Sequence, residues 1–182
     1  MQKYIVLDRD GVINYDSDEY IKSPQEFIPI PGSLAAIARL NKAGYKVIVA
    51  TNQSGIARGY FNLATLEDIH KKLIDLLAQA GGEIEEIFYC PHGPDDNCDC
   101  RKPQPGMLKD IIAKYLIHPD NLPVIGDSLR DLQMAQVMGA KAILVKTGKG
   151  ESTAIKIASL PEFANVPVYA DLAAAVDALI SP

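Results

Sequence analysis

The sequence predicts a three-layer α/β fold with a parallel sheet, and two observations indicate it. Short β-branched apolar runs alternate along the chain with segments of helical periodicity, which is the order expected of right-handed βαβ units. Continuous apolar runs of four or five residues are typical of strands that are covered on both faces. The six expected strands are 4–7, 46–50, 84–89, 122–125, 142–145 and 166–169.

Helices are expected between these strands, with start and stop signals in the sequence. They span 33–43, 65–80, 105–116, 128–138 and 171–180. Thr65 is expected to cap the second of them, and Pro105 suits a first helical position. Ser128 is the expected N-cap of the fourth, because Asp131 follows three residues later. In open parallel sheets, ligands bind beyond the carboxyl ends of the strands, so those ends are where a site is expected.

Composition bounds the class of protein. The chain has 182 residues, 48% of them hydrophobic and 23% charged, with a formal net charge of −5. These values predict one globular domain over 1–182 and argue against non-specific binding of nucleic acid. No apolar stretch approaches the roughly 18 residues that span a bilayer, and Asp8 interrupts the first apolar run. We therefore expect a cytoplasmic chain with neither nucleic-acid nor membrane partners. We also expect a monomer, although no residue pattern in the sequence bears on the oligomeric state.

All three cysteines fall in one short segment. Cys90, Cys98 and Cys100 lie there with His92, in the pattern Cys-x-His-x5-Cys-x-Cys. An odd number of closely spaced cysteines argues against a disulfide framework. Three thiolates and one imidazole make a complete tetrahedral set with no open position, the composition of a structural zinc site. The alternative is a group of free buried thiols beside an unrelated histidine.

Acidic residues follow two of the expected strands. Asp8 and Asp10 come directly after the first strand, and Asp127 follows the fourth. If they converge, these carboxylates suit Mg²⁺, which takes one or two protein carboxylates together with water and substrate phosphate. The alternatives are an Asx turn completed by Gly11 and a helix cap at Ser128.

Polar and basic residues occupy two further positions. Residues 51–54, Thr-Asn-Gln-Ser, follow the second strand and offer groups that bind phosphate oxygens, although, taken alone, a polar turn with helix-cap chemistry is the more common explanation of such a segment. Lys102 lies between the cysteine segment and Pro103. A lone lysine is usually a solvated surface residue, but the backbone on both sides of this one is constrained.

Together these segments resemble the haloacid dehalogenase superfamily of phosphotransferases. The ordered set covers roughly residues 4–145 and consists of Asp8-x-Asp10, Thr51, Lys102 and Gly126-Asp127-x-x-x-Asp131. At a finer level, residues 8–14 and 51–59, together with the cysteine segment 90–103, resemble one branch of this superfamily. That branch contains heptose-bisphosphate phosphatases and histidinol-phosphate phosphatases. The resemblance implies a Rossmann-like sheet without a large cap domain and with a small zinc-binding loop.

The resemblance also implies catalytic roles. Asp8 is expected to be the nucleophile, and Asp10 the general acid and base. Thr51 and Lys102 are expected to bind the transferring phosphoryl group. Mg²⁺ is expected on Asp8, the backbone carbonyl of Asp10, and Asp127. Zn²⁺ is expected to be structural.

Substrate contacts are expected from the same comparison. Arg101 is the candidate for a second phosphate, because guanidinium binds phosphate in a bidentate manner. Asp16 lies in an expected flap over 15–27, although a solvated acidic loop is an equal alternative. Strand alternation sends Arg9 away from the site, so we expect no catalytic role for it. The full set of expected substrate contacts is Asp16, Asn52, Gln53, Ser54, Arg101 and Ser128.

The expected activity is Mg²⁺-dependent removal of the 7-phosphate of a heptose 1,7-bisphosphate through an aspartyl-phosphate, serving lipopolysaccharide or surface-glycan synthesis. The expected partner is this small sugar phosphate. One alternative is a histidinol-phosphate phosphatase. A second is a non-catalytic domain that binds phosphosugars, since fold alone does not define function.

Overall fold

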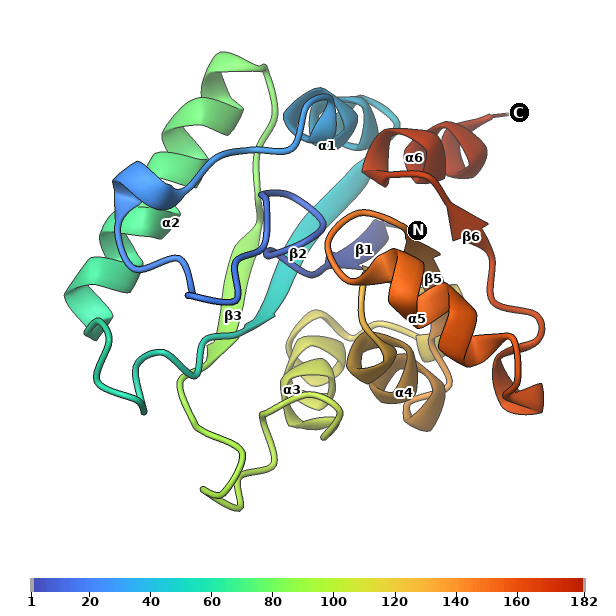
Figure 1. Cartoon of the computed structure of the whole chain (residues 1–182). Coiled ribbons are helices and arrows are strands. Elements are labelled where there is room, and N and C mark those ends of the chain that lie inside the picture. Colours follow the sequence, from blue (N-terminus) through green and yellow to red (C-terminus); the bar gives the residue numbers. More distant parts are fainter. Residues whose placement is uncertain (1, 182) are drawn as a thin grey trace.

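The computed structural model describes residues 2–181, and a parallel sheet with helices on both faces forms its centre (Figure 1). The sheet order is β3-β2-β1-β4-β5-β6, and every neighbouring pair is parallel. The strands are β1 (Lys3–Leu7), β2 (Tyr45–Asn52), β3 (Glu86–Cys90), β4 (Pro123–Gly126), β5 (Lys141–Val145) and β6 (Val168–Tyr169). The chain reverses its direction of travel across the sheet between β1 and β4, the topological switch point where such folds bind ligands.

Helices divide evenly between the two faces. Apolar contacts group α1, α2 and α6 on one face and α3, α4 and α5 on the other. Their bounds are α1 (Ser33–Lys42), α2 (Leu63–Gln79), α3 (Gly106–Tyr115), α4 (Leu129–Val137), α5 (Gly150–Ile157) and α6 (Leu172–Ile180). The fold class expected from the sequence is therefore confirmed, including the absence of a large cap domain within residues 2–181.

The core follows from strand alternation. Ile5 and Leu7 of β1 pack under the helices of the first face, whereas Val6, between them, packs against α3 and α4. All three are at most 1% exposed. A strand that is apolar on both faces can only lie in the middle of such a sheet, which places the end of β1 at its centre.

The N-caps of α2 and α4 test two of the expected helix starts. Helix α2 begins at Leu63, because the side chain of Asn62, not Thr65, forms the N-cap and accepts a hydrogen bond from the Thr65 N–H at 2.9 Å. The prediction of a Thr65 cap is therefore wrong. At α4 the Ser128–Asp131 capping box is confirmed.

One helix was not expected. Residues 148–150 suggest a loop, but Gly150 begins α5. A Cβ atom on Gly150 would lie 1.8 Å from the carbonyl oxygen of Val145, so only glycine allows this close approach between the helix start and the end of β5.

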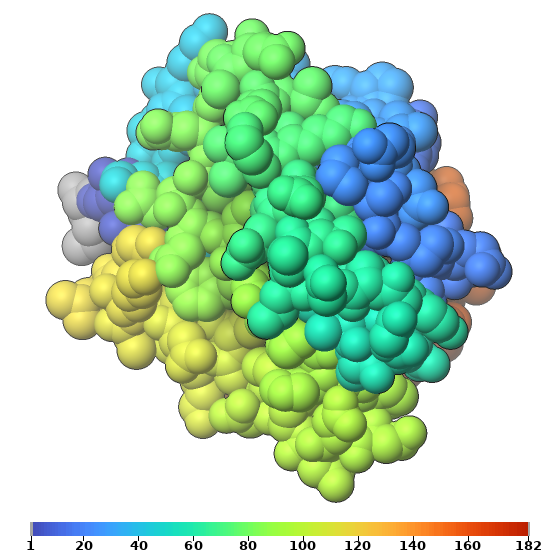
Figure 2. All heavy atoms as spheres, turned by 90° about the vertical axis from the view of Figure 1, so that its left-hand side faces the viewer, coloured from blue at the N-terminus to red at the C-terminus, as the bar shows by residue number. Residues whose placement is uncertain are grey.

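The loop that joins β3 to α3 projects from the molecule near the segment that leads into the start of α2, and Figure 2 shows this loop as a distinct lobe. It carries the cysteine cluster. Among the described residues, no helix combines the length and the apolar character needed to cross a membrane.

Candidate active site

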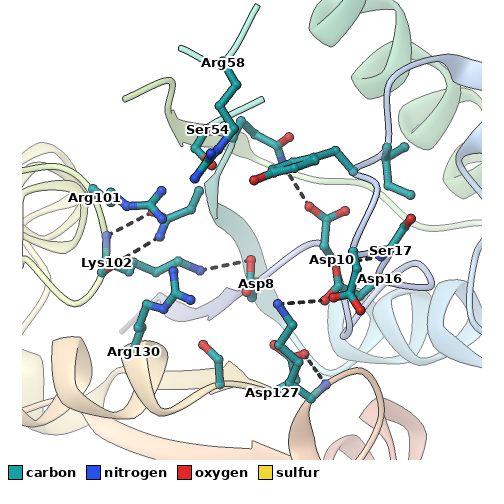
Figure 3. Close-up of a pocket in the computed structure, with 17 residues that line it drawn as sticks. Asp8, Asp10, Asp16, Ser17, Ser54, Arg58, Arg101, Lys102, Asp127 and Arg130 are labelled. Carbon is teal, nitrogen blue, oxygen red and sulfur yellow. Dashed lines mark hydrogen bonds and ion pairs between the residues drawn. The ribbon is translucent and has the colours of Figure 1, made fainter. Parts of the chain in front are cut away.

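A cavity of about 300 Å³ opens beyond the carboxyl ends of β1, β2 and β4 (Figure 3). It gathers side chains from segments far apart in the sequence, as a switch-point site should. The residues expected from the sequence that line it are Asp8, Asp10, Asp16, Asn52, Gln53, Ser54, Arg101, Lys102, Asp127 and Ser128. Thr51 differs: it is 1% exposed and its hydroxyl accepts a hydrogen bond from Gln53 at 2.9 Å, behind the cavity wall.

Asp8 and Lys102 meet at the centre of the cavity. The Lys102 Nζ lies 3.0 Å from Asp8 Oδ1 and 2.6 Å from Asp131 Oδ1. Burial opposes the charge on Lys102, which is 2% exposed, but Asp131 and Asp8 outweigh burial and raise its pKa above the ordinary value. Lys102 is therefore a fixed, charged ammonium group beside Asp8, not a solvated surface residue.

The backbone of Lys102 is also held in place. Asn52, at the end of β2, donates to the Lys102 carbonyl at 3.1 Å and accepts from the Lys102 N–H at 3.0 Å. Nζ donates to the Ala50 carbonyl at 2.9 Å. This reciprocal pair positions Lys102, and it uses one N–H and one oxygen lone pair of the Asn52 amide, which also lines the cavity.

Asp131 connects Lys102 to helix α4. Its Oδ1 binds the lysine, while its Oδ2 accepts from the N–H and the hydroxyl of Ser128 at 3.1 and 2.6 Å. Ser128 lines the cavity, but its hydroxyl is engaged by this cap. Both oxygens of Asp131 are therefore occupied by the protein itself.

Asp10 is held by three side chains. Arg9 donates to it from Nε and Nη2, Asn14 donates at 2.8 Å, and Gln53 donates at 2.9 Å. Burial works to raise the pKa of Asp10, but the Arg9 charge and the hydrogen bonds from Asn14, Arg9 and Gln53 together lower it. Strand alternation keeps Arg9 out of the cavity lining, yet Arg9 contacts an expected catalytic residue, which the sequence did not reveal.

Three carboxylates converge where a cation is expected. Ligand oxygens of Asp8, Asp127 and Asp131 lie within 4.8 Å of one another. Burial, together with Asp131, raises the pKa of Asp127 to about 7. Burial also raises the pKa of Asp8 well above its usual value, with Asp131 and Asp127 adding to the effect and Lys102 opposing it. One lysine thus faces several carboxylates, an anionic excess that a divalent cation would neutralise.

Glycines shape the space around Asp127. A Cβ atom on Gly11 or Gly148 would lie 2.1 or 2.2 Å from Asp127 Oδ2. Both glycines have positive φ, +83° and +58°, which glycine adopts without strain. The carboxylate is further fixed by the backbone N–H of Lys149, at 2.8 Å from Oδ2. Bare backbone around a buried carboxylate, with Asp8 opposite, suits a small hydrated ion such as Mg²⁺.

The cavity wall carries cations that the sequence analysis did not single out. Arg58, Arg130 and Lys149 line it together with Arg101. Figure 3 shows Arg101, Lys102 and Arg130 on one side of Asp8 and Asp16 on the other. The Lys149 Nζ lies 3.5 Å from an Asp16 oxygen, so the expected flap contacts the segment before α5. Arg58 follows β2, Arg130 lies in the first turn of α4 and Lys149 directly precedes α5, so only the fold brings these cations together.

The four expected zinc ligands also converge. The Cys90 Sγ lies 3.7 Å from Cys98 Sγ and 3.6 Å from His92 Nδ1, which is 3.2 Å from Cys100 Sγ. Zinc bonds of about 2.3 Å to sulfur and 2.0 Å to nitrogen place tetrahedral ligand atoms roughly 3.5–3.8 Å apart. All four atoms lie within 4.8 Å of one another, so the set fits a structural zinc ion.

The three thiols differ in how readily they ionise. Burial and the two neighbouring thiols raise the pKa of Cys100 above its usual value, and burial raises the pKa of Cys90. At Cys98 burial acts in the same direction, but hydrogen bonds from the backbone and the other thiols outweigh it and lower the pKa to about 7. Three thiolates packed this closely repel one another, so the cluster is stable as thiolates only around a cation. Arg101 and Lys102 follow directly, so this ion would fix the chain at the mouth of the active site.

The sheet order, the acidic pair after β1, the buried lysine and the acidic end of β4 define a haloacid dehalogenase-like hydrolase. Two family models match: "HAD-hydrolase-like" over residues 99–175, and "Polynucleotide kinase 3 phosphatase" over residues 5–129.

Relatives narrow this class. The chain is 57% identical to D-glycero-β-D-manno-heptose-1,7-bisphosphate 7-phosphatase of Pseudomonas putida. The alignment of 178 residues covers 98% of this chain and 99% of the relative. The crystal structure of the D,D-heptose 1,7-bisphosphate phosphatase of Bordetella bronchiseptica, complexed with magnesium and phosphate, is 53% identical, with a TM-score of 0.94 and 98% of both chains covered. The chain belongs to the family of D-glycero-D-manno-heptose-1,7-bisphosphate 7-phosphatases.

Proposed function

We propose that this chain removes the 7-phosphate of D-glycero-β-D-manno-heptose 1,7-bisphosphate, releasing inorganic phosphate and heptose 1-phosphate for lipopolysaccharide or surface-glycan synthesis. The observation that carries the proposal is the pairing of Asp8 with the buried ammonium of Lys102 in the cavity. This ion pair lies in a chain that aligns along nearly its whole length with relatives named D-glycero-β-D-manno-heptose-1,7-bisphosphate 7-phosphatase.

In the first half-reaction, a carboxylate oxygen of Asp8 attacks phosphorus, and the bond between phosphorus and the sugar oxygen breaks. Asp10 gives its proton to that oxygen, so the sugar leaves as an alcohol. The arriving phosphate is an anion, which repels a second charge on Asp10 and favours its protonated form. Lys102 stays charged and stabilises the negative oxygens of the transferring group.

In the second half-reaction, Asp10 takes a proton from water while the water oxygen attacks the phosphorus of the aspartyl-phosphate. The bond between phosphorus and the Asp8 oxygen breaks, and Asp8 is regenerated as a carboxylate. The proton given up in the first step is thereby recovered, so the cycle is balanced.

Asp8 and Asp127, with the Asp10 carbonyl, would hold Mg²⁺, and Cys90, His92, Cys98 and Cys100 would hold Zn²⁺. The magnesium ion, when bound, offsets the charge of the phosphate oxygens. Thr51 is proposed to support Gln53 at the phosphate end of the cavity, and Arg101 to receive the second phosphate.

We further propose that the chain is a monomer and that it acts in the cytoplasm. One chain supplies the whole set of side chains described above, and its three cysteines are unpaired, as a reducing compartment keeps them.

Phosphate release tests the proposal directly. The substrates are the α and β anomers of heptose 1,7-bisphosphate and histidinol phosphate, each with and without Mg²⁺. We expect turnover of the β anomer, at the highest kcat/KM, and only with the metal. Faster turnover of histidinol phosphate would assign the alternative activity of the same branch, and no turnover of any of them would refute the proposal.

Asp127→Asn is expected to raise the Mg²⁺ concentration that gives half-maximal activity, at least roughly tenfold, because loss of even an outer partner of a metal ligand costs that much. The fold should persist, since the change removes a charge from a crowded buried cluster. A magnesium titration of activity provides the measurement. Asp18→Asn, at the cavity mouth but outside the cluster, should leave the half-saturating Mg²⁺ concentration unchanged. Equal values for Asp127→Asn and wild type would contradict the assignment.

A further inference from the structure

Arg9 is the largest fully buried side chain of the protein's described residues, although it neighbours two catalytic carboxylates. It is 0% exposed and does not line the cavity. A buried guanidinium is costly unless its donors are used. Arg9 uses them in two directions, towards Asp10 and towards His70 of α2.

The hydrogen bonds to Asp10 are unevenly shared between its two oxygens. Oδ1 accepts from Arg9 Nε at 3.1 Å, from Arg9 Nη2 at 2.9 Å and from Asn14 at 2.8 Å. Oδ2 accepts from Gln53 at 2.9 Å and shares Nη2 at 3.1 Å. A carboxylate oxygen has two lone pairs, so Oδ1 is saturated and Oδ2 alone can bond a proton without losing a full hydrogen bond.

His70 completes the arrangement from the far side of Arg9. Its Nε2 lies 3.1 Å from Arg9 Nη1, and because a guanidinium nitrogen only donates, Nε2 is the acceptor and the proton is on Nδ1. Burial first, and then the Arg9 charge, lower the pKa of His70 to about 3, which agrees with a neutral ring. The histidine is 8% exposed and does not line the cavity.

We infer that His70 and Arg9 are positioning residues for proton transfer: His70 orients the Arg9 guanidinium, which holds Asp10 so that Oδ2, and not Oδ1, gives and takes the proton at the leaving oxygen. The inference rests on the proposed function, because it assumes that Asp10 acts as acid and base. Neither residue touches the substrate, so both act on the proton-transfer step rather than on binding.

Two leaving groups separate positioning from a purely structural role. An alkyl alcohol needs a proton to leave, whereas p-nitrophenolate leaves without one. The experiment measures the rate constant of enzyme phosphorylation, by rapid quench, with glycerol 2-phosphate and with p-nitrophenyl phosphate. The proteins compared are wild type, His70→Leu, His70→Gln and Arg9→Lys, all with Mg²⁺ and zinc loaded.

His70→Leu should lower phosphorylation from the alkyl ester roughly tenfold and from the aryl ester less than about threefold, a fraction of what a whole general acid contributes. His70→Gln, whose carbonyl oxygen accepts from Arg9, should restore the alkyl rate to within about threefold. Arg9→Lys keeps the positive charge but loses the paired N–H donors of the guanidinium. Its rate of phosphorylation by the alkyl ester should therefore fall roughly 100-fold, without a comparable fall for the aryl ester.

Equal losses on the two esters would mean that the pair only supports the fold, and would overturn the inference, as would an unchanged alkyl rate in folded His70→Leu. Should His70→Leu not fold, the same comparison in His70→Gln and Arg9→Lys decides the question. Because neither test substrate is a heptose, the outcome stands apart from the proposed substrate, which the wild-type assay on heptose bisphosphate checks separately.

Discussion

Asp8→Asn is expected to abolish phosphate release, by roughly 10⁴-fold or more, as the loss of a nucleophile does in other covalent enzymes. An amide does not attack phosphorus, so no aspartyl-phosphate forms. Asparagine has almost the same size, so the cavity keeps its shape. Burial and the neighbouring carboxylates already disfavour a charge on Asp8, and its removal therefore relieves repulsion, although the contact with Lys102 is weakened.

Phosphate release and thermal unfolding together check this prediction. The variant should be inactive, with a melting temperature no lower than that of wild type by more than a few degrees. Asp110→Asn makes the same chemical change on the exposed face of α3, and it should keep full activity. Near-normal turnover by folded Asp8→Asn would refute the nucleophile assignment.

Loss of zinc is the second large effect that we expect. Cys98→Ser removes one of four ligands from a set whose composition leaves no spare position. The loop from residue 91 to residue 99 carries mostly proline, glycine and polar residues, so it has little apolar content to order itself without the ion. Since Lys102 follows two residues after the last ligand, the main consequence should be misplacement of Lys102, with activity reduced by roughly 100-fold or more.

Metal analysis and activity, measured on the same samples, provide the test. Wild type purified without chelators should hold about one zinc ion per chain, as the ligand count requires. Cys98→Ser should hold none, while circular dichroism shows the sheet intact. Asp95→Ser, an exposed position in the same loop, should keep both zinc and activity. A wild-type protein that is free of zinc yet fully active would refute the proposal that a structural zinc ion positions Lys102.

The strands were predictable because their signal is local. Each buried strand of this parallel sheet reads as a continuous apolar run, and each expected strand lies within two residues of an observed one or overlaps it. The start of α2 was misplaced because Asn62 and Thr65 are both good caps, and local sequence does not say which side chain will close the turn. Helix α5 escaped notice because it is short and begins with glycine, a residue that usually ends helices.

The site was predictable to the extent that its residues follow strand ends. Asp8, Asp10 and Asp127 do so, and the sheet brings them together as expected. The alternation of side chains along a strand also predicted correctly that Arg9 points away from the cavity. Alternation does not predict which residues Arg9 contacts on the other side. His70, 61 residues further along, could be paired with Arg9 only once α2 was placed against the sheet. The cations Arg58 and Arg130 were hidden for the same reason.

Asp131 has a consequence that reaches beyond geometry. Its side chain closes the first turn of α4 through Ser128 and, at the same time, anchors the ammonium of Lys102. Helix ends are where local opening is easiest. Opening of that turn would therefore remove one of the three partners of the Lys102 ammonium and leave Asp8 and the Ala50 carbonyl to hold it. Ser128 therefore has two roles, because a replacement that the helix tolerates would still loosen the carboxylate that holds the Lys102 ammonium.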